Sequence, residues 1–221
     1  MNIEKQIDYL KNFITEKRFK RFQEVLQERT RYITIVLEDV FQGHNASAVL
    51  RSCDCFGLQD VHVIENRNEF KPNEEVSMGA AQWLTIHRYK EKEKNNTERC
   101  YQWLKQKGYK IIATSPHYQS VSIKELQLDK PLAIVFGAEK EGLSDYALKK
   151  ADVHVYIPMY GFTESFNISV SAALCMYELT ARLRSSDIDY HLSNDEKNRL
   201  LLEWLKESIK DADKILERMP G

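Results

Sequence analysis

Apolar and polar positions follow two different periods along this chain. Short runs rich in β-branched residues predict strands at 33–40, 61–65, 110–115, 132–137 and 153–159. Between them, helical spacing predicts helices near 46–57, 95–108, 144–151 and 168–184, and polar stretches predict loops at 66–75 and 90–97. This alternation is typical of an α/β protein with a mostly parallel sheet covered by helices on both faces. Functional residues are then expected at the C-terminal ends of the strands.

Both flanks of this region have helical periodicity. Residues 3–29 carry apolar side chains at helical spacing, and in the tail Ser193 followed by Glu196 forms a capping-box pattern. One predicted apolar stripe of the tail runs through Leu201, Leu205, Ser208, Ala212 and Ile215. We therefore divide the chain into a helical N-terminal extension at 1–30, a central α/β domain at 31–184 and a helical C-terminal extension at 185–221. The nearly neutral tail is expected to pack on its own domain or on a second subunit.

Composition excludes several classes of protein. With 221 residues, 43% of them hydrophobic and a net charge of −1, the chain has the composition of a globular protein with one sizeable domain. No leader pattern and no run of about 18 uncharged apolar residues is present, so we expect a cytoplasmic protein without a membrane partner. Cys53 and Cys55 point about 200° apart on a helix, so we expect no metal site.

The net charge hides a local excess of basic residues. Residues 1–31 hold eight Lys or Arg against five Asp or Glu, and Phe19 and Phe22 lie within the basic cluster. Two interpretations stay open at this point: contact with an RNA backbone, or a solvated helix face with aromatic anchors. The residues concerned are Arg18, Lys20, Arg21, Arg29 and Arg31.

Three short strings at the ends of apolar segments carry the candidate chemistry. They are NASAVLR at 45–51, FGAEKEG at 136–142 and IPMYGFTESFNISVSAAL at 157–174. None is a G-x-G-x-x-G dinucleotide motif after the first strand, and GAEKEG lacks the Gly-Lys-Ser/Thr end of a P-loop. A ligand must therefore be bound in another way.

The first string lies on a predicted amphipathic helix. Ala46, Val49, Leu50, Cys53 and Phe56 form its apolar stripe, whereas Ser47, Arg51 and Asp54 fall on the opposite side. Arg51 therefore points away from the core of this helix. From the pattern alone it is either a surface partner of Asp54 or a functional residue.

The other two strings favour close approach of the backbone. Gly137 follows an apolar strand, and glycine permits a close backbone contact or a positive φ, while Glu139 is either a helix cap or a functional carboxylate. In the third string no charge occurs from Asn167 to Tyr177, and its small residues allow a close crossing of two chain segments.

Taken together, the three strings resemble the SpoU family of RNA ribose 2′-O-methyltransferases, and most closely its TrmH branch. The resemblance covers roughly residues 30–184, and the helical flanks are similar in kind. It implies a SPOUT fold, in which the C-terminal part of domain 31–184 forms a deep trefoil knot, and S-adenosylmethionine as cofactor. It also implies methylation of guanosine 18 in the D-loop of tRNA, and no DNA partner. We expect a homodimer, because the small-residue helix of the third string and the amphipathic C-terminal arm offer more apolar surface than one domain needs. A 23S ribosomal RNA substrate and a noncatalytic RNA-binding scaffold are the alternatives.

The resemblance also assigns roles to individual residues. The expected catalytic residues are Arg51, Asn45, Glu139, Ser165 and Asn167, and the expected cofactor-binding residues are Thr114, Gly137, Ile157, Met159 and Phe166. The basic cluster of the N-terminal segment is the expected RNA contact. We expect Arg51 at least to orient the ribose hydroxyl and stabilise its developing charge, because a guanidinium has a pKa above about 12. The chain departs from the TrmH pattern at Glu141, Glu164 and Phe166. These departures affect the expected contacts with RNA, and therefore which nucleotide is chosen.

Overall fold

The computed structural model describes residues 2–71, 73–115 and 120–219, and these residues form two compact units. One unit is the continuous segment Arg31–Tyr190, and the other combines residues 1–30 with residues 191–221. The two helical flanks therefore share one unit, although they lie at opposite ends of the sequence.

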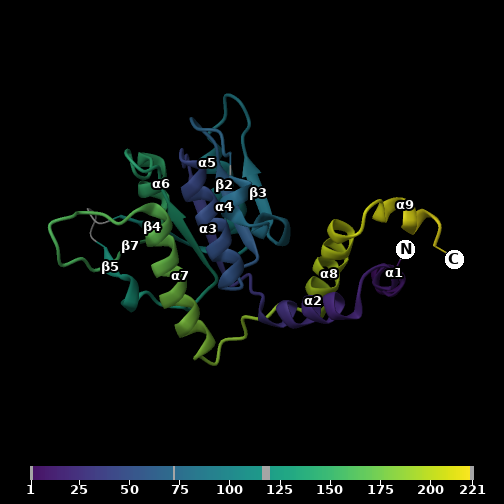
Figure 1. The fold of residues 1–221 in the computed structure, drawn as a ribbon. Coiled ribbons are helices and arrows are strands. Elements are labelled where there is room, and N and C mark those ends of the chain that lie inside the picture. Colours follow the sequence, from purple (N-terminus) through teal and green to yellow (C-terminus); the bar gives the residue numbers. More distant parts are fainter. Residues whose placement is uncertain (1, 72, 116–119, 220–221) are drawn as a thin grey trace. The chain divides into compact units, whose positions relative to one another are not determined.

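A parallel sheet is the centre of the unit Arg31–Tyr190 (Figure 1). Its strands are β1 (Ile33–Glu38), β2 (Asp60–Ile64), β3 (Thr85–Tyr89), β4 (Lys110–Thr114), β5 (Val121–Ser122), β6 (Leu132–Phe136) and β7 (Val153–Tyr156). They are ordered β3-β2-β1-β6-β4-β7-β5, and the pairs of neighbours in the described chain are parallel. The predicted α/β class with a parallel sheet is confirmed. The order changes direction where β6 lies between β1 and β4, which is the place where parallel α/β sheets bind ligands.

Helices cover both faces of this sheet, as the alternation predicts. α3 (Gly43–Cys55) and α7 (Ile168–Arg184) bury apolar side chains on one face, and α5 (Asn96–Gln106) and α6 (Asp145–Lys150) do so on the other. The shorter elements are α4 (Glu74–Ser77) and the 3-10 turns η2 (Ala80–Trp83) and η3 (Ile123–Glu125). Strands β1 and β6 are buried throughout, so they read as continuous apolar runs.

The sequence pattern missed two strands and misplaced one serine. β3 and β5 lie at the two edges of the sheet; β3 carries exposed and half-exposed polar residues, and β5 has only two residues, so neither forms an apolar run. Ser47 was predicted on the outer side of α3, but it is fully buried because the segment after β2 covers it. Its Oγ accepts a hydrogen bond of 2.6 Å from the backbone N–H of Asn73.

Aromatic and histidine rings of β2, β3 and α5 pack around the buried His62. His62 stacks on His87 with ring centroids 4.6 Å apart and also packs against Trp103 at 4.9 Å. Burial, and then repulsion from His87, lowers the pKa of His62 to about 3. Asp60 on the same strand forms an ion pair of 2.9 Å with Arg31.

The unit of the two flanks consists of α1 (Ile3–Leu10), η1 (Lys11–Phe13), α2 (Glu16–Glu28), α8 (Asn194–Ser208) and α9 (Ala212–Glu217). An antiparallel bridge between Thr30 and His191 joins its two chain segments. The predicted capping box of Ser193 and Glu196 is confirmed at the start of α8. The tail is not one continuous helix, because Asp211 has a φ of 59° and separates α8 from α9. No helix in the described part of the chain is long and apolar enough to cross a membrane.

Candidate functional site

A pocket of about 600 Å³ opens at the carboxyl ends of β4, β6 and β7, next to the first turns of α3 and α7. This volume is within the range of about 300–1,000 Å³ that is typical of small-molecule sites. The predicted cofactor residues that line it are Thr114, Gly137, Ile157, Met159 and Phe166. Of the predicted catalytic residues, Asn45, Glu139, Ser165 and Asn167 also line it, whereas Arg51 does not.

One residue from each of the three strings takes part in a continuous hydrogen-bond chain at this pocket. Asn45 Nδ2 donates to Glu139 Oε1 at 2.9 Å, and Asn167 Nδ2 donates to Asn45 Oδ1 at 3.1 Å. Asn45 Nδ2 also donates to Gln42 Oε1 at 3.1 Å. The side-chain amide of Asn45 is therefore fixed from two sides, with one lone pair of Oδ1 left for a further donor.

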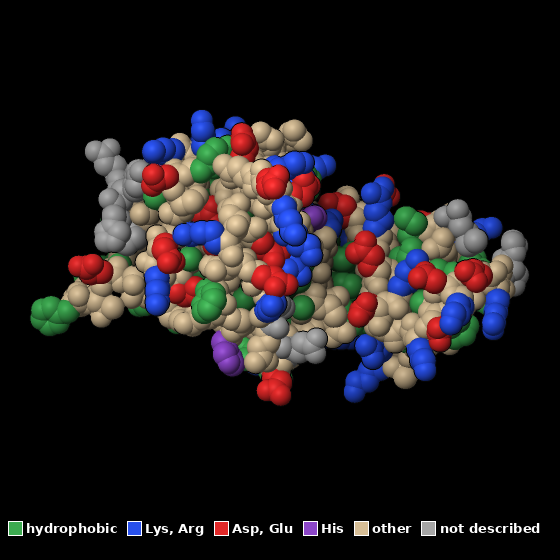
Figure 2. All heavy atoms as spheres, turned by 90° about the horizontal axis from the view of Figure 1, so that it is seen from above, with side chains coloured by type: hydrophobic (Ala, Val, Ile, Leu, Met, Phe, Trp, Pro, Cys, Tyr) green, Lys and Arg blue, Asp and Glu red, His purple; other side chains and the backbone are tan. Residues whose placement is uncertain are grey.

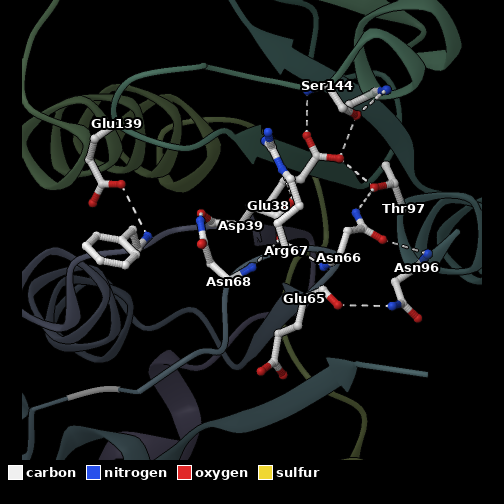
Figure 3. Close-up of polar contacts among 12 residues, drawn as sticks. Glu38, Asp39, Glu65, Asn66, Arg67, Asn68, Asn96, Thr97, Glu139 and Ser144 are labelled. Carbon is white, nitrogen blue, oxygen red and sulfur yellow. Dashed lines mark hydrogen bonds and ion pairs between the residues drawn. The ribbon is translucent and has the colours of Figure 1, made fainter. Parts of the chain in front are cut away.

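Glu139 acts on the N-terminal end of α3. Its carboxylate accepts hydrogen bonds from the backbone N–H groups of Phe41 at 3.2 Å and Gln42 at 3.3 Å, the first of which is drawn in Figure 3. Burial raises the pKa of Glu139, but the hydrogen bonds from Asn45 and from these amides outweigh it, so the pKa is below its usual value. The ionised carboxylate therefore serves as the cap that the side chain of Gln42 does not provide.

Asn167 is held by the helix that follows it. It is the N-cap of α7, and its Oδ1 accepts from the backbone N–H of Ser169 at 2.8 Å and from the hydroxyl of Ser169 at 2.6 Å. This capping directs its Nδ2 toward Asn45. The uncharged start of α7 thus positions a polar group at the pocket.

The loop after β6 is closed so tightly that only glycine fits at its start. A Cβ atom on Gly137 would lie 2.2 Å from the backbone carbon of Gly142 and 2.3 Å from the backbone nitrogen of Leu143. Two backbone hydrogen bonds, of 3.0 and 2.9 Å, join Ala138 and Gly142. The prediction that glycine permits a close backbone contact here is confirmed.

Thr114 and Arg51 differ in how they relate to the pocket. The hydroxyl of Thr114 donates to the carbonyl oxygen of Val135 at 2.8 Å, so this side chain fixes the end of β4 against β6. Arg51 is exposed on α3, outside the pocket lining. Among the described residues its guanidinium has no hydrogen-bond or ion-pair partner, and the pairing with Asp54 that the pattern allowed is not formed.

The basic cluster does not lie on one accessible surface. Arg18, Lys20 and Arg21 are exposed on α2, but the expectation for Arg29 is wrong, since this residue is 1% exposed. The guanidinium of Arg29 lies over the ring of Trp204, 5.3 Å from its centroid, and an enclosed side chain cannot contact an RNA backbone. Arg31 is partly exposed and its charge is paired with Asp60.

Charge is mixed rather than concentrated on the face shown in Figure 2, where basic and acidic side chains are interspersed. The two close cysteines cannot share an ion, because Cys53 is buried and Cys55 is exposed. No group of three or more potential metal ligands occurs among the described residues.

Comparisons with known proteins agree with one another. Residues 32–177 match the family model of the SpoU rRNA Methylase family. A tRNA (guanosine(18)-2'-O)-methyltransferase from Borreliella burgdorferi is 44% identical over 207 residues, which are 94% of this chain and 93% of that protein. The enzyme of the same name from Thermus thermophilus is 33% identical over 87% of this chain and 97% of its own length.

Solved structures give the same result for the fold. The crystal structure of the TrmH/SpoU tRNA modifying enzyme from A. aeolicus superposes with a TM-score of 0.79 and 30% sequence identity. The superposition covers 89% of this chain and 98% of that one.

Proposed function

This chain belongs to the SpoU rRNA methylase family, and on that premise we propose that it is an S-adenosylmethionine-dependent tRNA (guanosine-18-2′-O)-methyltransferase. The relatives from B. burgdorferi and T. thermophilus carry that name and match this chain over most of their length. The observation that carries the proposal is the hydrogen-bond chain Asn45–Glu139–Asn167, which joins the three family strings at one pocket.

The residues of the pocket fit this cofactor. Gly137 and Gly142 line the pocket without a side chain, and the apolar side chains of Ile157, Met159 and Phe166 offer contacts to a nucleoside. When bound, S-adenosylmethionine supplies a methyl group that its sulfonium already activates. Residues of this chain then have to place a ribose 2′-oxygen in line with that methyl group and help it lose its proton.

Asn45 and Glu139 have distinct parts in this proposal. The hydrogen bonds from Nδ2 to Glu139 and Gln42 fix the orientation of the Asn45 amide. Its Oδ1 accepts one hydrogen bond from Asn167, so the second lone pair is available to orient a ribose hydroxyl. Glu139 orients Asn45 rather than accepting the proton, because its carboxylate already receives three hydrogen bonds and its pKa is lowered. In this proposal Arg51 orients the 2′-hydroxyl and stabilises the negative charge that develops on its oxygen.

A methylation assay with matched substrates tests the proposal. The protein, S-adenosylmethionine and a tRNA transcript with guanosine at position 18 should yield 2′-O-methylguanosine by mass spectrometry. A tRNA carrying 2′-deoxyguanosine there should accept no methyl group. Transfer to a 23S rRNA transcript alone would refute the tRNA substrate, and cofactor binding without transfer to either RNA would support a noncatalytic scaffold.

We also propose that two copies of the chain form a homodimer. Val170, Leu174 and Tyr177 repeat at i, i+4 and i+7 on α7 and are 45%, 39% and 66% exposed. An apolar stripe of this kind is typical of a helix that packs against a second chain. Sedimentation should show a dimer at micromolar concentration and a monomer for Leu174→Glu, whereas a monomeric unmodified protein would contradict the proposal.

Two further features follow from family membership and stay proposals. One is the deep trefoil knot, formed by threading of the chain around the third string and α7. The other is a cytoplasmic location, where tRNA is available as substrate. Protease protection of the segment 157–184 and cell fractionation would test them.

A further inference from the structure

A buried carboxylate outside the pocket is connected to the pocket loop. Glu38, the last residue of β1, is 1% exposed and does not line the pocket. Its Oε2 accepts from the backbone N–H of Ser144 at 2.8 Å, and its Oε1 accepts from the Ser144 hydroxyl at 2.8 Å. Figure 3 shows both bonds between the two residues.

Ser144 is the residue at which the pocket loop ends. It follows Leu143 directly, and its Oγ also caps α6 by accepting from the N–H of Ala147 at 3.1 Å. The loop 137–143 is therefore closed at its start by the bridge between Ala138 and Gly142 and fixed at its end by Glu38. Since Gly137 and Leu143 line the pocket, the position of Ser144 determines the position of the pocket wall.

Glu38 is also bonded to a residue outside the pocket loop. Its Oε1 also accepts from the hydroxyl of Thr97, which is in turn bonded to Asn66 Nδ2 at 2.9 Å (Figure 3). A single carboxylate thus connects the pocket loop to α5 and to the loop after β2. A buried carboxylate is costly unless its oxygens accept hydrogen bonds. This network therefore favours one geometry of the residues bonded to Glu38.

We infer that Glu38 is a positioning residue that holds the loop 137–143 in the shape required to bind the cofactor. The inference rests on the proposed function, because the affinity for S-adenosylmethionine is the quantity it predicts. Glutamine has nearly the same shape, but it is uncharged and has one acceptor oxygen in place of two, so it cannot accept from both the N–H and the hydroxyl of Ser144 in this geometry. The loop should then lose its fixed end.

Three variants separate positioning from simple loss of stability. Glu38→Gln should raise the Kd for S-adenosylhomocysteine at least tenfold, and Ser144→Ala, which removes one of the two bonds, should raise it about threefold to tenfold. Thr97→Val removes a bond to the same Oε1 from a residue outside the loop, and its Kd should stay within twofold. All three are expected to lower the melting temperature.

The kinetics and hydrogen exchange supply independent readouts. For Glu38→Gln, KM for S-adenosylmethionine should rise while kcat at saturating cofactor recovers, and the amides of Ala138 and Gly142 should exchange faster than in Thr97→Val. The inference is overturned if Thr97→Val weakens binding as much as Glu38→Gln, or if Glu38→Gln binds normally. If Glu38→Gln does not fold, equal affinities of Ser144→Ala and Thr97→Val overturn it. An unmodified protein that binds no cofactor would instead refute the proposed function.

Discussion

A single methyl group at Gly137 should open the pocket loop. In the structure, the added Cβ of Gly137→Ala would lie 2.2–2.3 Å from backbone atoms of Gly142 and Leu143. Ordinary carbon contacts lie at about 3.5–4.0 Å, so the two segments must separate by more than about 1 Å. Backbone atoms cannot rotate away as a flexible side chain would.

The magnitude follows from the contacts that this separation breaks. The two hydrogen bonds between Ala138 and Gly142 contribute about 1 kcal/mol each, so the closed loop loses about 2 kcal/mol relative to open forms. If open forms then predominate and only the closed loop binds the cofactor, the apparent Kd rises by up to the same free energy, which corresponds to about 30-fold.

Calorimetric titration of Gly137→Ala with S-adenosylhomocysteine measures this change in Kd directly. Gly108→Ala is a matched control, because Gly108 has a φ of +83° but no atom within 4 Å of an added Cβ. The control should lower stability through backbone strain and leave the affinity unchanged. An affinity of Gly137→Ala within threefold of the unmodified protein would refute the reasoning, and so would an equal loss in Gly108→Ala.

Three further outcomes follow from the structure. Arg51→Ala should cut turnover by about 100-fold without changing cofactor affinity, and Arg51→Lys should recover little of it; normal turnover of either variant would return Arg51 to an ordinary surface position. Replacement of Arg18, Lys20 and Arg21 by Ala should weaken tRNA binding and reduce the slope of log K against log[salt] by about 2–3, whereas an unchanged slope would assign them to a solvated face. Because the pKa of His62 is about 3 when folded and 6.5 when unfolded, only the unfolded state takes up its proton between these values, so stability falls as pH decreases. At pH 5 the loss is about 2 kcal/mol, and denaturant titrations of His62→Phe should show a flatter pH profile from pH 7 to 5 if this residue is responsible.

Local sequence patterns were sufficient to predict much of the fold. The buried strands β1 and β6 are continuous apolar runs, and α7 has the bounds 168–184 that the pattern predicted. The capping box of Ser193 and Glu196 uses only contacts within four residues, so its sequence signature is sufficient. Nine of the predicted site residues lie in the three strings, and all of them except Arg51 line the pocket.

Local patterns failed where distant segments meet. The pattern could not show that Ser47 is covered by the chain near Asn73, or that Arg29 is enclosed beside Trp204, because helical periodicity reports only the faces of one helix. Glu38 gave no signal either, since a carboxylate at a strand end looks the same whether it is solvated or buried. Sequence periodicity could not find the edge strand β3, which lacks a continuous apolar run.

The amino-acid sequence by itself determined the α/β class, the main elements and the residue types required at the site. Only the tertiary structure decided that Asn45, Glu139 and Asn167 share one hydrogen-bond chain, although up to 122 residues separate them. The physical reason is the order of the sheet: β6 pairs with β1, and this pairing brings the loop after β6 to the start of α3. Strand order depends on how the two faces of the sheet are covered, which no local pattern specifies.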